Sequence, residues 1–206
     1  QITFSKFKVD IFGCIGGCFW ANRPTPHIFF GFCSRIFQMA TLEGNPRKAC
    51  TMSHEEVIAA TREWIEKAVI GLNLCPFAKS VYVKNQVRIV VSSARHIDGF
   101  LEDLDRELDH LAEVDPEVTD TTLLIHPTLF PDFLDFNDVH QIADEAVAEH
   151  ELEGVIQIAS FHPDYQFEGT EPDDITNYTN RAPFPTLHLI REESLDRAVE
   201  AFPEAE

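Results

Sequence analysis

In the last three quarters of the chain, apolar residues recur every three or four positions in four stretches, the spacing of an amphipathic helix. Ser53 and Glu56 form the Ser-x-x-Glu pattern of a capping box before the first stretch, and Gly71 is placed to end it. Pro116 stops the second stretch, and Ser194 is placed to cap the last one. The pattern predicts helices over 54–70, 97–114, 139–147 and 195–202.

Four short apolar runs between these stretches predict β-strands, because they are rich in β-branched or aliphatic residues and bounded by turn formers. Helices and strands alternate until a long loop, which is followed by a last strand and a last helix. This order predicts an α/β fold, with a single small mixed sheet of about four strands flanked by helices. A ferredoxin-like α+β arrangement is the alternative. The predicted strands are 86–93, 121–125, 155–159 and 186–190.

The connections between strands predict their directions. Helical crossovers make the first three strands parallel. We expect the strands that end at Ile125 and Ala159 to be parallel neighbours. The last strand is expected to run antiparallel to the third, because it then starts at the edge where the third ends. The short return leg of the loop would bring Arg181 back to that edge, beside His162.

Two of the predicted strands end in the same dipeptide, His-Pro, at His126 and His162. Ligand sites in open α/β sheets gather beyond the carboxyl ends of the strands. If the two strands are neighbours, the imidazoles share one rim. The alternative is that each His-Pro pair only ends its strand. Because both histidines occupy equivalent places, a shared binding site and a plain strand end are given equal weight.

The segment from Phe161 to Thr186 has no predicted secondary structure, and compact domains seldom contain such long loops without a functional reason. Its only cation is Arg181, which stands beside Asn177 and Asn180. Amide and guanidinium groups suit a carboxylate or phosphate, since arginine makes forked contacts with such anions. Internal pairing of the arginine with a nearby acid is the alternative; the candidates are Asp173, Asp174 and Glu168.

These observations predict a small cytosolic enzyme that acts on a small anionic metabolite. The histidines would exchange protons, since the imidazole pKa lies near neutrality, while a tyrosine and a glutamate orient them. The predicted catalytic residues are His126, His162, Tyr165 and Glu168. The predicted substrate-binding residues are Asn177, Asn180 and Arg181.

Two other classes of function remain open. The two histidines with Asp164 or Glu168 could hold zinc or iron in a non-catalytic metal- or ligand-binding module, although no tight ligand spacing supports a metal. The long loop could instead be the docking surface of an interaction protein. Cys75, in a Cys-Pro-aromatic stretch, follows a predicted helix and has no second cysteine nearby, so we expect it to be buried and unreactive.

Charge divides the chain into two parts. Residues 1–51 carry six Lys/Arg and two Asp/Glu, whereas residues 52–206 carry ten Lys/Arg and 33 Asp/Glu. So acidic a body repels phosphates, which argues against a nucleic-acid partner. It contains one cysteine and no apolar run of membrane-spanning length, so we expect a cytoplasmic protein.

Residues 1–51 hold four of the five cysteines and show no steady periodicity. A targeting segment and a Cys-rich metal module are weak interpretations, because Asp10 interrupts the apolar run and no histidine pair accompanies the cysteines. We predict a non-native or disordered extension before a single α/β domain over 52–206.

Four stretches carry a resemblance to a known family: AVIGLNLCPFAKSV, DTTLLIHP, IASFHPDYQFEG and DDITNYTNRAPFPTLHLIRE. They resemble the bacterial domain-of-unknown-function family 1415 from about Glu55 to the end of the chain. Members of that family continue beyond the EAFP stretch, so we expect the chain to be truncated at Glu206. The resemblance implies no activity, cofactor or substrate.

Overall fold

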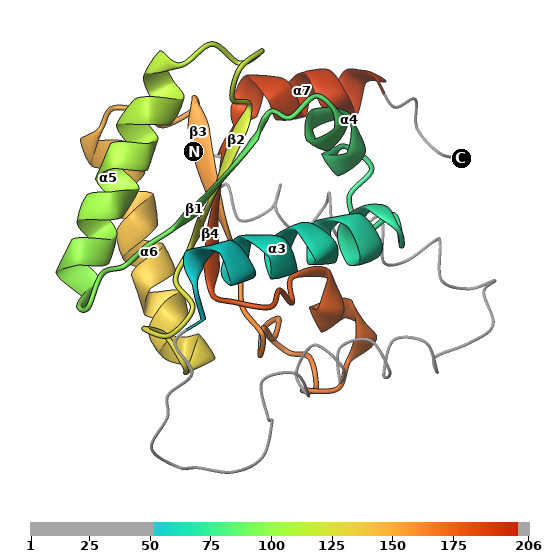
Figure 1. Ribbon diagram of the computed structural model, residues 1–206, viewed down its shortest axis with the longest axis vertical. Helices are drawn as coiled ribbons and strands as arrows, with labels where there is room; N and C mark the ends of the chain where they lie inside the picture. The colour runs from blue at the N-terminus through green and yellow to red at the C-terminus, as the bar shows by residue number, and fades with distance from the viewer. Residues whose placement is uncertain (1–51, 202–206) are drawn as a thin grey trace.

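The computed structural model describes residues 52–201, and the predictions for residues 1–51 lie outside this part (Figure 1). Its centre is one mixed sheet in the order β1-β2-β4-β3. β1 pairs parallel with β2, and β4 pairs antiparallel with both β2 and β3. The α/β fold predicted from the sequence is therefore confirmed. The strands are β1 (Val87–Val91), β2 (Thr121–Ile125), β3 (Ile156–Phe161) and β4 (Thr186–Arg191).

The position of β4 corrects one expectation and confirms another. β2 and β3 run in the same direction, but they are not neighbours, because β4 lies between them. The chain leaves β3 at Phe161 and re-enters the sheet opposite it at Thr186, so β4 runs back along β3. The antiparallel direction predicted for the last strand is thus right. β4 pairs with the edge of β2 that β3 was expected to occupy, so β3 lies one strand further along the sheet.

Helices cover both faces of the sheet, unlike the one-sided ferredoxin-like alternative. α5 (Ile97–Glu113) and α6 (Phe133–Glu149) lie on one face, and α3 (His54–Trp64) lies on the other (Figure 1). Alternation along each strand sends Leu187 and Leu189 of β4 to the first face. The first core contains, among others, Phe100, Leu104, Leu108, Leu124, Phe136, Ile156, Ile158, Leu187 and Leu189. The second contains Trp64, Ile65, Leu123, Phe161 and Ala182.

The first predicted helix is observed in two parts. α3 begins with the predicted capping box, in which Ser53 and Glu56 exchange hydrogen bonds with each other's backbone. It continues as a π-helix, η1 (Ile65–Ile70), which ends at Gly71. A side chain at Gly71 would collide with the carbonyl of Lys67, which explains the glycine.

Several boundaries differ from the sequence prediction. A short helix, α4 (Ala78–Val83), follows η1 where no element was predicted, and the long loop contains a 3-10 helix, η2 (Ile175–Thr179). α7 (Glu192–Ala201) starts before Ser194, whose hydroxyl bonds Asp120 instead of capping the helix. No helix within residues 52–201 combines the length and the apolar character needed to cross a bilayer.

Candidate functional site

His126 is clamped between backbone groups at the carboxyl end of β2. Its Nδ1 accepts hydrogen bonds from the backbone N–H groups of Leu129 (2.9 Å) and Thr128 (3.3 Å). The proton must therefore sit on Nε2, which donates to the carbonyl of Ala94 at 2.8 Å. The side chain is 3% exposed, and burial lowers the pKa of His126. This histidine closes its own turn and ties it to the loop that follows β1.

His162 repeats the arrangement after β3. Its Nδ1 accepts the N–H of Asp164 at 3.1 Å, and its Nε2 donates to the carbonyl of Phe130 at 3.0 Å. The residue is 1% exposed. Phe130 connects the two sites, because its ring packs edge-on against His126 with centroids 5.8 Å apart. Both His-Pro pairs are therefore similar turns in which the ring holds the backbone.

Proton exchange with a substrate needs a ring nitrogen that can reach the substrate. In both histidines each ring nitrogen already has a backbone partner. The acid–base roles assigned to His126 and His162 from the sequence stay a prediction. In this geometry each ring holds the backbone of its own turn in position.

The asparagines of the long loop are also used internally. Asn177 is 0% exposed. Its side-chain oxygen accepts from the Phe167 N–H and the Thr170 hydroxyl (2.9 Å each), and its amide nitrogen donates to the Glu171 carbonyl at 2.9 Å. Asn180 donates from its side chain to the carbonyl of Ser160 and accepts the N–H of His162 at its own carbonyl. The loop therefore returns to His162, as expected from the sequence.

Arg181 binds carbonyl groups of the same loop. Its Nε donates to Tyr165 O at 3.1 Å and its Nη2 to Pro172 O at 2.6 Å, while the guanidinium lies 4.6 Å from the centre of the Tyr178 ring. Its own carbonyl accepts the indole N–H of Trp64 at 3.1 Å, which fastens the loop to α3. Within the described chain no carboxylate forms an ion pair with this arginine, including the three acids considered as partners.

The two remaining predicted residues differ in their surroundings. Tyr165 is half-buried, and its ring packs against Phe133, which also packs against the His162 ring at 5.7 Å. Burial raises the pKa of Tyr165. Glu168 is exposed. In residues 52–201, no three His, Cys, Asp or Glu side chains gather closely enough to hold a metal ion. Cys75 is half-buried, and burial raises the pKa of its thiol.

A cleft of about 410 Å³ opens between β1 and α5. Apolar groups form part of its lining, and four polar side chains form the remainder. One lining residue is a glycine, Gly99, at which a Cβ would lie in van der Waals contact with the Cβ of Ala94, 3.4 Å away. The lining residues are Val90, Val91, Ser93, Ala94, Gly99, Asp103, Arg106 and Glu107.

The wall of this cleft is held in place by two side chains. The N–H of Ala94 donates to Ser92 Oγ at 3.1 Å, and Ser92 Oγ donates to Asp103 at 2.5 Å. The carbonyl of Ala94 accepts the proton of His126. Ser92 itself bonds through its N–H to the carbonyl of Ile125 at 2.8 Å. The peptide groups around Ala94 are thereby fixed on both sides.

Ser93 stands between these fixed residues, and its hydroxyl points to another histidine. Its Oγ lies 3.0 Å from Nε2 of His54, the first residue of α3. Both side chains are exposed. This pair could not be found from the sequence, since Ser93 has the pattern of a strand end and His54 that of a helix start. Nothing in the sequence connects two residues so far apart.

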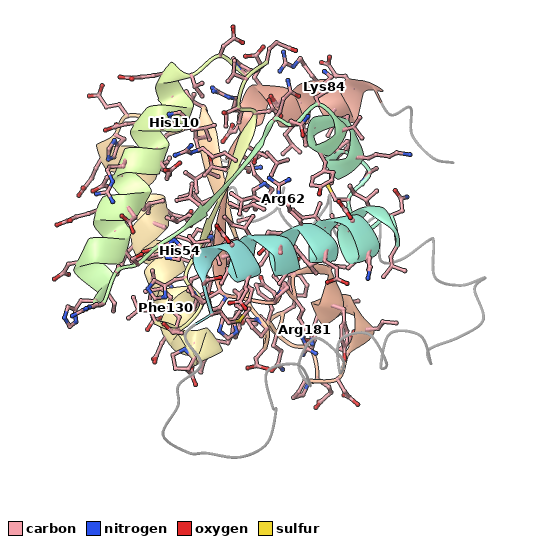
Figure 2. All side chains as sticks on the ribbon, viewed as in Figure 1. His54, Arg62, Lys84, His110, Phe130 and Arg181 are labelled. Carbon is pink, nitrogen blue, oxygen red and sulfur yellow. The ribbon has the colours of Figure 1, made fainter. Side chains whose placement is uncertain are left out.

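Each of the two acids that line the cleft pairs with an arginine. Arg88 makes a forked contact with Glu107 at 2.7 and 3.0 Å, and the hydrogen bond raises the pKa of the arginine. Arg106 pairs with Asp103 and remains largely exposed. Figure 2 shows Arg181 and Phe130 at the edge of the sheet where β3 ends, and Lys84 and His110 away from it.

Comparison with known proteins gives a family and no activity. No curated protein and no solved structure matches the chain. The family model described as Protein of unknown function (DUF1415) matches residues 56–206, which includes all four strands and the cleft. The chain therefore belongs to the DUF1415 family.

Proposed function

We propose that the protein is a small enzyme that transfers an acyl group of a small anionic metabolite, with Ser93 as nucleophile and His54 as general base. One observation carries this proposal: Ser93 Oγ lies 3.0 Å from His54 Nε2 at the rim of a cleft of about 410 Å³. A nucleophile within hydrogen-bond reach of a base is one part of the arrangement used in covalent catalysis, of which acyl transfer by serine is an example. In a full triad a third residue orients the base, and no residue is assigned to that role beside His54.

The chemistry follows from the pair. With the proton of His54 on Nδ1, its Nε2 accepts the hydroxyl proton while Ser93 Oγ attacks the carbonyl carbon of an ester or thioester. His54 then returns that proton to the leaving alcohol or thiol, which departs as the acyl-serine forms. Water, deprotonated by the same nitrogen, releases the acid and restores the serine.

The size and lining of the cleft support a small substrate. Ligand pockets of proteins start at about 300 Å³ and combine apolar walls with a few polar groups. Val90, Val91 and Gly99 supply the apolar part here. Arg106, which is exposed at the rim, can turn from Asp103 to an anionic group of the metabolite.

In this scheme His126 is a positioning residue. It touches the carbonyl of Ala94 and not the reacting atoms, so it fixes the turn that presents Ser93. We place the enzyme in the cytoplasm, since the body contains the single cysteine Cys75. Its acidity supports a small-molecule partner in preference to a nucleic acid.

A thermal-shift screen of a metabolite library tests the proposal, because a ligand that binds only the folded state raises the melting temperature. A ligand of the cleft should stabilise the wild type and Ser93→Ala, and should fail to stabilise Gly99→Leu, whose side chain fills the cleft. Turnover of that ligand should vanish in Ser93→Ala and His54→Gln. Circular dichroism confirms that the variants fold. Undiminished stabilisation of Gly99→Leu, or turnover by Ser93→Ala, would overturn the proposal.

A second candidate is an interaction protein that docks through the long loop. The observation in its favour is that Asn177, Asn180 and Arg181 all bind groups of the protein itself, so they build a fixed surface. A screen with no hits, together with capture of a partner that is lost on substitution of exposed Ile175, would favour this candidate.

A further inference from the structure

His188 lies in the middle of β4 and is the histidine of this sheet that keeps an open ring nitrogen. Its neighbours in the sheet are Leu123 of β2 and Ala159 of β3. The alternation of β4 sends it to the face that carries α3, away from Leu187 and Leu189. The residue is half-buried. Its environment is therefore a sheet face, in contrast to the turns of His126 and His162.

One hydroxyl fixes the tautomer of the His188 ring. Thr121 Oγ1 lies 2.6 Å from the carbonyl of Leu189, which can only accept, so the hydroxyl proton belongs to that bond. The same oxygen lies 2.7 Å from Nε2 of His188. It must accept there, which places the imidazole proton on Nε2. Nδ1 is left with its lone pair.

No donor within residues 52–201 satisfies that lone pair. The side-chain hydrogen bond of His188 is made to Thr121 through Nε2. In this part of the chain the fully buried side-chain atoms that lack a partner are Thr122 Oγ1 and Arg191 Nε, so the unpartnered Nδ1 of His188 keeps some exposure to solvent. Nδ1 is therefore a partly exposed acceptor without a donor of its own in this part of the chain. Burial lowers the pKa of His188 to about 4, so the ring is neutral near pH 7 and the acceptor persists.

The surroundings of the ring are mainly apolar and incompletely covered. The Phe161 ring lies 5.9 Å from the His188 ring, and Trp64 packs edge-on against Phe161 at 5.5 Å. α3 packs over β1, which is the edge strand opposite to β3. On the β3–β4 half of this face, four neighbouring side chains remain half-buried: Gln157, Ala159, His188 and Ile190. Ala159, the partner of His188 on β3, carries only a methyl group beside the imidazole.

We propose that His188 anchors a second binding site, which takes a small aromatic or apolar molecule presenting one N–H or O–H donor to Nδ1. The site is separate from the cleft, because the cleft lies between β1 and α5 and His188 faces the opposite side of the sheet. The apolar floor contributes contact area, and the single acceptor selects ligands by their donor. A mostly apolar wall with one placed polar group is the usual composition of such sites.

Phenol and anisole test the proposal as a matched pair, since anisole keeps the ring and replaces the O–H by a methyl ether. Titration is followed by the ¹⁵N shift of His188 Nδ1 and by the fluorescence of Trp64. Phenol should shift Nδ1, and anisole should bind about tenfold more weakly, the value of one hydrogen bond. The preference should disappear in His188→Leu.

Thr121→Val is a second variant for the case that His188→Leu does not fold. It releases the ring from its fixed tautomer and should weaken phenol binding while leaving anisole binding unchanged. His96→Ala, at an exposed position before α5, is the control and should bind phenol as the wild type does. Equal binding of phenol and anisole, or no binding of phenol at millimolar concentration, would overturn the proposal.

Discussion

Two loops begin at the edge of the sheet where β1 and β3 end, and they use their polar side chains in opposite ways. The long loop, residues 162–185, directs Asn177, Asn180 and Arg181 to its own backbone and to β3. In the short loop between β1 and α5, Ala94 is fixed by Ser92 of the same loop and by His126, which follows β2, while Ser93 stays exposed beside His54. A loop rich in polar residues is thus not necessarily a binding loop. The polar atoms that the fold leaves open are the better guide to chemistry.

The largest effect is expected from His162→Ala. The substitution leaves the Asp164 N–H and the Phe130 carbonyl without partners and opens a cavity among aromatic rings. We expect a loss of about 4 kcal/mol in the free energy of unfolding, measured with urea. Exposed His96 makes no capping bond, so His96→Ala should cost less than about 0.5 kcal/mol. Equal effects of the two substitutions would contradict the conclusion that the His162 ring holds its turn together.

Asn177→Ala probes the long loop directly. At a fully buried side chain the Phe167 N–H loses its partner, and the Thr170 hydroxyl and the Glu171 carbonyl each lose one of two partners. Unfolding should therefore become easier by about 3 kcal/mol. Ser93→Ala, in the short loop, removes an exposed contact and should change stability by less than about 0.5 kcal/mol. Denaturation curves of the two variants give both free energies of unfolding for direct comparison. A stable Asn177→Ala would show that the loop does not depend on its internal bonds.

Acid should weaken the fold through the histidines whose pKa is lowered. The ordinary histidine pKa is about 6.5, and that of His188 in the fold is about 4. Between these values the unfolded chain binds more protons, so stability is full above pH 6.5 and falls as the pH drops towards 4. His188 contributes on the order of 2–3 kcal/mol to this loss, and His126 adds to it in the same direction.

The His188→Gln variant isolates that contribution. Its stability between pH 6.5 and 4 should fall less steeply than that of the wild type, as followed by urea unfolding at stepped pH. An unchanged slope would mean that His188 is protonated without cost, and that the ring is not desolvated.

A smaller loss of stability is expected to distinguish two adjacent serines. Ser92→Ala removes the hydroxyl that holds the Ala94 N–H and bonds Asp103, and should cost about 1–2 kcal/mol. Hydrogen exchange at the Ala94 amide should accelerate, because its acceptor is gone. Ser93→Ala should leave that exchange rate unchanged. Identical exchange in both variants would show that Ser92 does not fix the turn.

Much of the fold could be predicted from the sequence. Periodicity located the strands and the main helices, and the short return leg of the long loop predicted the direction of β4. The placement of β4 between β2 and β3 could not be predicted, since an antiparallel strand can pair with either free edge. The start of α6 was placed too late, because the cap at Asp132 lies ahead of the apolar repeat that marked the helix.

The candidate site was less predictable than the fold. A His-Pro pair after a strand does not reveal whether the ring faces a ligand or the carbonyl of Ala94 or Phe130, because those carbonyls arrive from other segments. Ser93 and His54 meet only because α3 packs across β1. Such contacts belong to the tertiary structure, and no spacing in the sequence encodes them.

Phosphonylation of Ser93 tests the central claim most directly. A fluorophosphonate reacts with a serine whose proton is removed by a neighbouring base, and peptide mass spectrometry identifies the modified residue. We predict modification at Ser93 and not at Ser92, with a rate that falls about 100-fold in His54→Gln. An unmodified Ser93, or a rate that does not depend on His54, would contradict the account.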